Sequence, residues 1–194
     1  MAYEYFVLSN FGVRYFMTDY TNSESIPSSV DGTNEITSVI SCDLGKFNKE
    51  NKKYRTLNSN GWESIAPLGQ TSDDATFQCV REGQGDVYTG AAGTTTFQRI
   101  KKWFMDATKA GGTTSPKVIT EIVPRGQANG SVVYEGTSYY CVPANWEPGT
   151  KDTETGQEYS FSVSPFGPQT PLVVTYVPAT EQTAESFSLA KGTV

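Results

Sequence analysis

The chain has 194 residues, of which 37% are hydrophobic, 12% aromatic and 19% charged, and its formal net charge is −6. This length fits a single domain with its own core. The acidic balance argues against a protein that grips nucleic acid, because such proteins use clustered lysine and arginine to displace counterions. No apolar run reaches the roughly 18 residues of a membrane span, and the first residues lack a secretory leader. We therefore expect no membrane partner and synthesis in the cytoplasm.

The first 35 residues are expected to form an N-terminal arm and a loop. Alternation of Phe11, Val13, Tyr15 and Met17 with smaller or polar residues indicates a β-hairpin within residues 1–20. The polar run 21–35 contains a proline and an Asp-Gly pair, which are typical of an exposed loop.

Between this loop and the middle of the chain, the sequence predicts two strands and two connections. Alternation predicts a strand over 36–42, with Ile36, Ser38, Ile40 and Cys42 on one face. The basic stretch 45–55 indicates a long loop or a protruding hairpin. Residues 61–70 are predicted as a turn-rich connection, and 74–81 as a strand.

Residues 94–110 form the one segment with helical periodicity. Phe97, Ile100, Trp103 and Phe104 recur at helical spacing, and they predict a buried face that packs on a sheet. Threonines at 94–96 provide an N-cap, and Gly111-Gly112 provide the stop.

After the helix the pattern is entirely β. We predict strands over 117–124, 158–167 and 171–178, and a hairpin over 131–143 that turns at Glu135-Gly136. Residues 179–194 are expected to be a loose C-terminal tail. The whole chain is therefore predicted to be one mainly β domain, an antiparallel sandwich or barrel with a single flanking helix over about 94–110.

The sequence offers little catalytic chemistry. The absence of histidine removes serine–histidine and cysteine–histidine nucleophile systems. Cys42, Cys79 and Cys141 are far apart in strand-like runs, which indicates small buried thiols and not a metal or disulfide framework. We expect no enzyme, and no catalytic, cofactor-binding or metal-binding residue.

One catalytic alternative stays open on sequence grounds. A carboxylate pair drawn from Glu63, Asp73, Asp74 and Glu82 would be the minimum for glycoside hydrolysis. Asp73-Asp74 is better explained as a turn before a strand.

Charge is segregated along the chain, with basic stretches at 41–60 and in the helix and acidic stretches around them. Such a pattern is typical of solvated loops of mixed sign, and a second interpretation is complementary patches for head-to-tail contacts between copies. Arg99, Lys101 and Lys102, on the basic side of the helix, are the candidate subunit interface.

The order of segments over residues 36–178 resembles the major tail tube proteins of tailed bacteriophages and of related phage-tail-like particles. The resemblance is carried by "NGWESIAPLGQTSDDATFQCVREG", the helix with "KKWF", "VITEIVPRG", "GSVVYEGTSYYCVPANWEP" and "GQEYSFSVSPFGPQTP". It implies two packed antiparallel sheets flanked by one helix, and subunits that form hexameric rings stacked into a tube. It further implies a lumen that conducts DNA, a location in the virion after synthesis in the host bacterium, and tape-measure, tail terminator and baseplate proteins as partners.

A second hypothesis comes from another class of protein. A β-sandwich that binds a carbohydrate or a host receptor would use Trp62, Tyr139, Tyr140 and Trp146 as an exposed aromatic platform. Their positions in strand-like runs favour core packing instead.

Overall fold

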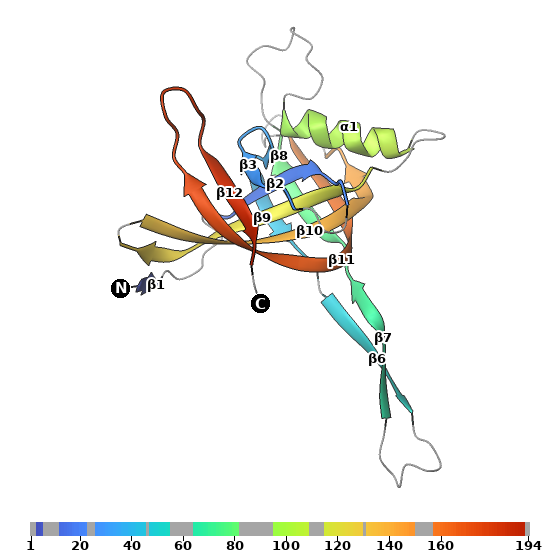
Figure 1. Cartoon of the computed structure of the whole chain (residues 1–194). Helices are drawn as coiled ribbons and strands as arrows, with labels where there is room; N and C mark the ends of the chain where they lie inside the picture. The colour runs from blue at the N-terminus through green and yellow to red at the C-terminus, as the bar shows by residue number, and fades with distance from the viewer. Residues whose placement is uncertain are drawn as a thin grey trace.

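The computed structural model describes residues 3–5, 12–22, 26–45, 47–54, 64–81, 95–108, 115–129, 131–149 and 157–192. Within these ranges one helix, α1 (Thr96–Thr108), accompanies strands that pair only in antiparallel fashion. The strands are β1 (Tyr3–Tyr5), β2 (Arg14–Asp19), β3 (Ser29–Asp31), β4 (Glu35–Ile36), β5 (Val39–Asp43), β6 (Phe47–Tyr54), β7 (Ser64–Ser72), β8 (Ala75–Val80), β9 (Lys117–Ala128), β10 (Ser131–Glu147), β11 (Glu158–Val177) and β12 (Ser186–Lys191). The predicted mainly β fold with one flanking helix is confirmed (Figure 1). No helix in these ranges has the length and apolar character needed to cross a bilayer.

A ten-stranded sheet forms the body of the molecule (Figure 1). Its order is β3-β12-β11-β10-β9-β2-β4, with β1 added to β9 and with β8 and β5 branching from β11. β11 pairs with β10 along one edge. Along its other edge, the first half of β11 pairs with β8 and the second half with β12. A strand that takes part in two layers makes a corner between them, so the sheet folds over on itself.

The larger core lies between the sheet and α1. The rings of Phe77 and Phe161 stack with centroids 4.8 Å apart. The helix adds Phe104 against Phe161 and Phe97 against Tyr159. These aromatic side chains fill the space that the curled sheet encloses, and α1 covers it.

A second core lies on the opposite face of β2 and β9. Successive residues of a strand point to opposite faces, so Met17 enters the larger core while Phe16 enters the second one. There Phe16 meets Phe187 of β12, with ring centroids 5.7 Å apart. The central strands are therefore covered on both faces, as in a sandwich.

The hairpin predicted at Glu135-Gly136 is wrong, because β10 runs unbroken through it. Gly136 pairs with Ile122 on one side and Leu172 on the other. A Cβ atom at this position would lie only 2.8 Å from Cγ2 of Val174. Glycine is thus needed here for close packing in the middle of the sheet and not for a turn.

The two strands predicted over 158–167 and 171–178 are one strand, β11. The residues between them form an irregularity in the pairing with β10, where Ser138 faces Thr170 but Tyr140 faces Phe166. Gly167 has a φ of 73° there. The glycine and prolines that suggested a break therefore mark a bulge.

The N-terminal segment is not a hairpin arm followed by a loop. β1 and β2 do not pair with each other, since both pair with β9, at residues 126–128 and 117–122 respectively. Part of the predicted loop forms β3 and β4, and Val30 in β3 is buried. The polar run takes these positions because its few apolar residues complete the second core.

The predicted loose tail is also wrong over its middle part. Residues 186–191 form β12, which pairs with both β11 and β3. Phe187 and Leu189 alternate with exposed neighbours and are buried in the second core. The alternation of apolar and polar residues over 186–191 is typical of a strand, and the sequence prediction gave it too little weight.

The strand predicted over 36–42 is interrupted. Ser38 has a φ of 58°, so the chain bends between β4 and β5. Ile36 is buried while Ile40 is exposed, which shows that they do not share one inner face. Farther along, 45–55 contributes β6 of a protruding hairpin, as one of the two alternatives foresaw, but 61–70 supplies its partner β7 and is not a turn-rich connection.

Candidate assembly surfaces

Helix α1 docks through the four side chains predicted for its buried face. Phe97, Ile100, Trp103 and Phe104 are all at most 9% exposed. The indole Nε1 of Trp103 donates a hydrogen bond to the Ser115 carbonyl at 2.7 Å. At the start of the helix, Thr95 Oγ1 accepts from the Gln98 amide, which makes it the N-cap. The glycines predicted as the stop lie outside the described residues.

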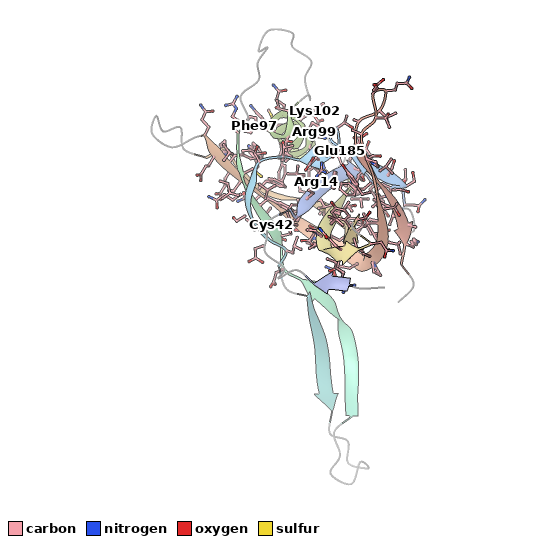
Figure 2. All side chains as sticks on the ribbon, turned by 90° about the vertical axis from the view of Figure 1, so that its left-hand side faces the viewer. Arg14, Cys42, Phe97, Arg99, Lys102 and Glu185 are labelled. Atoms are coloured by element: carbon pink, nitrogen blue, oxygen red, sulfur yellow. The ribbon has the colours of Figure 1, made fainter. Side chains whose placement is uncertain are left out.

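Arg99 fastens the helix to the strand that precedes β5. Its guanidinium donates to the carbonyl oxygens of Thr33 and Glu35 (Figure 2). Thr96 supports the same junction, because its hydroxyl donates to the Glu35 carbonyl. Arg99 is half-buried and makes these bonds within the subunit, and its place in a subunit interface stays a prediction.

Lys101 and Lys102 remain on the solvent side of α1. Both are exposed, and Lys102 forms an ion pair with Asp106 one turn later in the helix. Such a pair adds only about 0.3–0.5 kcal/mol. Within the described part of the chain neither lysine makes a strong stabilising contact, so both stay predicted residues of the subunit interface.

One broad face of the sheet is acidic and rich in hydroxyl groups. It is the outer side of β5, β8, the first half of β11 and the end of β10, and we call it the acidic face. Its members are exposed or half-buried and alternate with core residues: Ser41, Asp43, Asp74, Thr76, Gln78, Asn145, Glu147, Glu158, Ser160, Ser162 and Ser164. The strand stretches 39–43, 74–80, 143–147 and 158–164 contain no lysine or arginine.

Hydrogen bonds across strands hold the acidic face in place. Gln78 Nε2 donates to Glu158 Oε2 at 2.9 Å, and Ser160 Oγ donates to Glu147 Oε2 at 3.2 Å. Ser164 Oγ donates to Asp74 Oδ1. These contacts orient the carboxylates. Because the donors are neutral, they do not cancel the negative charge of the carboxylates.

A two-stranded ribbon, β6 with β7, leaves the body at the lower end of β5 and β8 (Figure 1). The two strands pair from Phe47–Ser72 to Tyr54–Ser64 and pair with no other described strand. An isolated two-stranded hairpin is at best marginally stable in water. The ribbon therefore has two open edges and no sheet of its own to lie on.

A groove of about 460 Å³ lies beside α1. Its other walls are the end of β2, the turn at residues 33–34 and the start of β9. Four of its charged residues form two ion pairs, Lys117 with Asp19 and Lys102 with Asp106, and a fifth, Arg99, donates to backbone carbonyls. Paired charges of both signs select no particular ligand, so we assign the groove no binding role.

A small group of half-buried polar side chains packs against the larger core. Tyr15 donates a hydrogen bond to Glu121 Oε1 at 3.2 Å, and Cys42 lies beside them. The Tyr139 hydroxyl is buried nearby without a hydrogen-bond partner among the described residues. Burial raises the pKa of the Cys42 thiol to about 12, so this thiol is neutral at physiological pH and a poor nucleophile.

We predict that Glu121→Gln stabilises the protein at pH 7 but not at pH 4. Burial raises the pKa of the Glu121 carboxyl, and the hydrogen bond from Tyr15 offsets this only in part. The folded state therefore holds its proton to higher pH than the unfolded state, and stability falls as pH rises above the ordinary value of about 4.3. Because water still reaches part of the carboxyl, we expect a gain of roughly 0.5–1 kcal/mol in urea unfolding at pH 7.

Glu185→Gln is the control of opposite sign. The hydrogen bond from Tyr176, and then Arg14, lower the pKa of Glu185, so its charge stabilises the fold at neutral pH and this contribution is lost on acidification. Equal effects of the two substitutions at pH 7 would contradict the assignment of Glu121.

The structure bears on both sequence alternatives. Tyr139 and Tyr140 are 3% and 2% exposed, so they are unavailable for a sugar platform. Trp146 packs between Phe97 and Tyr159, and Trp62 lies outside the described residues.

Of the four carboxylates considered for glycoside hydrolysis, Glu63 and Glu82 also lie outside the described residues, and Asp74 accepts a hydrogen bond from Ser164. The described residues contain no group of three histidine, cysteine or acidic side chains that is placed to hold a metal.

Comparisons with known proteins add a distant likeness in shape. No protein-family model matches the chain. No curated protein matches it either. Among solved structures, a chain of the six-fold symmetrised baseplate of the anti-feeding prophage is similar over 83% of this chain and 91% of that chain, with 9% identity and a TM-score of 0.45. A likeness this distant carries no argument about function.

Proposed function

We propose that this protein is a structural subunit of a phage tail or phage-tail-like particle, which self-assembles into stacked, hexameric rings that form a tail tube. The observation that carries the proposal is the β6–β7 ribbon. Its edges are open and it stands clear of the body, so a contact with another subunit would supply the pairing that the subunit itself lacks. The resemblance over residues 36–178 supports the same conclusion.

The acidic face is the proposed lining of the lumen. DNA carries one negative charge per phosphate, so a wall with carboxylates and without lysine or arginine repels it and offers no ionic attachment. The serine and threonine hydroxyls keep such a wall hydrated. This assignment suits a conduit through which DNA passes during ejection, and through which a tape-measure protein passes before it.

This role places the subunit in the virion, after synthesis in the host bacterium. Its partners are other copies of itself, a tape-measure protein, and the terminator and baseplate proteins that close the two ends of the tube. The proposed role is architectural and needs neither catalysis nor a cofactor.

Self-assembly of the full chain tests the proposal directly. Purified protein is expected to form rings or tubes in negative-stain electron microscopy, with sedimentation that depends on concentration. A species that stays monomeric at high concentration and at every salt concentration tested would overturn the proposal.

We predict that Lys101→Glu with Lys102→Glu weakens assembly and leaves the fold intact. Both side chains are exposed, and only the Lys102–Asp106 pair is lost, so the unfolding free energy should change by less than about 1 kcal/mol. Reversal of two charges at a contact with an acidic neighbour should instead shift assembly to higher protein concentration, as measured by sedimentation. Lys191→Glu, at an exposed position on β12, is the control for a single charge reversal outside the helix. Equal assembly of the helix variant and the control would remove α1 from the interface.

A further inference from the structure

Two hairpins of the body diverge and leave a fork between them (Figure 1). β10 and β11 are paired from Glu147–Ser160 up to Tyr134–Val174, where their pairing stops. Beyond this point, and as far as the described residues go, residues 131–133 pair with β9 alone and residues 175–177 with β12 alone. We call these two stretches the fork.

Within the described part of the chain, the fork presents two strand edges that face each other without a strand between them. Because β10 and β11 are neighbours below the fork, the edges that separate above it carry backbone groups that would be paired in a continuous sheet. The rings of Tyr134 and Tyr176, with centroids 6.1 Å apart, lie where the two strands separate. Unpaired edges of this kind accept a strand from another chain.

The fork carries large apolar side chains on both faces, beside the polar Ser131 and Thr175. Val132, Val133, Tyr176 and Val177 are each 38–41% exposed, although they are large hydrophobic residues. Consecutive residues of a strand point to opposite faces, so each edge carries one such side chain on either side. A strand that entered the fork would thus be covered above and below, like an internal strand of a sheet.

We infer that the fork is the docking site for the β6–β7 ribbon of a second copy of this chain, which pairs with the open edges of β10 and β11. The inference rests on the proposed self-assembly and names the surface that the ribbon meets. Among the described residues, the ribbon has an open edge on each of its two strands, and the fork has one unpaired edge on β10 and one on β11, so each strand of the ribbon can pair with one edge of the fork.

Charge favours this occupant. In the arm formed by the end of β11, the connection to β12 and β12 itself, Glu185 is ion-paired with Arg14 and Lys191 ends the strand, so the negative charge offered to a partner is that of the exposed Glu181. β6 has the basic sequence FNKENKKY. A basic ribbon on an acidic arm is electrostatically complementary. Because ribbon and fork are different surfaces of one chain, the contact is head-to-tail and continues from copy to copy.

Two full-length variants test the inference by complementation. Val133→Lys with Val177→Lys places charges in the fork and leaves the ribbon unchanged, and Lys52→Glu with Lys53→Glu reverses charge on the ribbon and leaves the fork unchanged. Each alone is expected to need about tenfold or more protein to assemble than the unsubstituted chain. Mixed together, they retain one intact ribbon and one intact fork per pair, so sedimentation should show dimers and no longer species.

Hydrogen exchange on the unsubstituted protein gives a second readout. Amides at the open edges of 131–133 and 175–177 should exchange more slowly in the assembled protein than in the dilute monomer. Ile40→Lys, at an exposed apolar residue outside the fork, is the matched control and should assemble normally.

The outcomes separate this inference from the proposed function. If the chain assembles while the fork variant assembles equally well and the fork amides are unprotected, the fork is not the docking site and the proposed function stands. A chain that never assembles overturns both. Should the fork variant fail to fold, the exchange rates of the unsubstituted chain decide.

Discussion

Trp103→Ala is expected to lower the free energy of unfolding by about 3–5 kcal/mol, the usual cost of truncating a buried tryptophan. The Trp103 side chain is 5% exposed and packs edge-on against Phe104 with ring centroids 5.4 Å apart. Its indole also supplies the hydrogen bond to the Ser115 carbonyl. The substitution therefore opens a cavity beneath α1 and removes the donor from that carbonyl.

Urea unfolding followed by circular dichroism measures this loss. Met105→Ala is the matched control, because Met105 is in the same helix and is 53% exposed. Its loss should be below about 1 kcal/mol, within the range of surface substitutions. If Trp103→Ala cost no more than the control, α1 would not be held by its aromatic face, and the lid over the larger core would need another explanation.

The helix was the part of this fold that the sequence predicted best. Its signal is local, because Phe97, Ile100, Trp103 and Phe104 repeat at the spacing of a helix and lie within eight residues of one another. The presence of strands could also be predicted from a local signal, the short alternating runs such as 75–80. Local periodicity thus located the elements that bury one face.

Strand ends and strand partners could not be read in this way. Gly136 looks like a turn residue in the sequence, and only the closeness of Val174 shows that it serves packing in a sheet interior. Similarly, Phe187 and Leu189 look like an isolated pair until Val30 and Phe16 surround them. Both cases depend on contacts between residues distant in the chain, which no short window contains.

The candidate surfaces also differ in whether a local pattern in the sequence can reveal them. Lys101 and Lys102 could be identified from helical periodicity, but the same pattern could not distinguish them from Arg99. The carbonyl partners of Arg99, in β4 and the turn before it, lie more than sixty residues earlier in the chain. The acidic face and the fork were not predicted. The first requires knowledge that β5, β8, β10 and β11 are neighbours, and the second requires knowledge of where two of them separate.

Arg14→Ala is expected to destabilise the protein by about 2–4 kcal/mol, because it leaves a partly buried carboxylate without its cation. Arg14 donates to both oxygens of Glu35, at 2.8 and 2.6 Å, and to Glu185 at 2.9 Å (Figure 2). The Glu35 side chain is only 18% exposed. The guanidinium also lies over the rings of Phe16 and Phe187, so its removal uncovers the second core.

Arg125→Ala is the matched control for an arginine ion pair. Arg125 binds Glu135 at 2.7 Å, but its side chain is 64% exposed, so its removal should cost less than about 1 kcal/mol. The double variant Arg14→Ala with Glu35→Gln separates charge from packing. If the stranded Glu35 carboxylate causes most of the loss, the double variant should be more stable than Arg14→Ala alone, whereas equal stability would assign the loss to the rings of Phe16 and Phe187. A loss for Arg14→Ala no larger than for Arg125→Ala would show that β2, β4 and β12 are held together without this arginine.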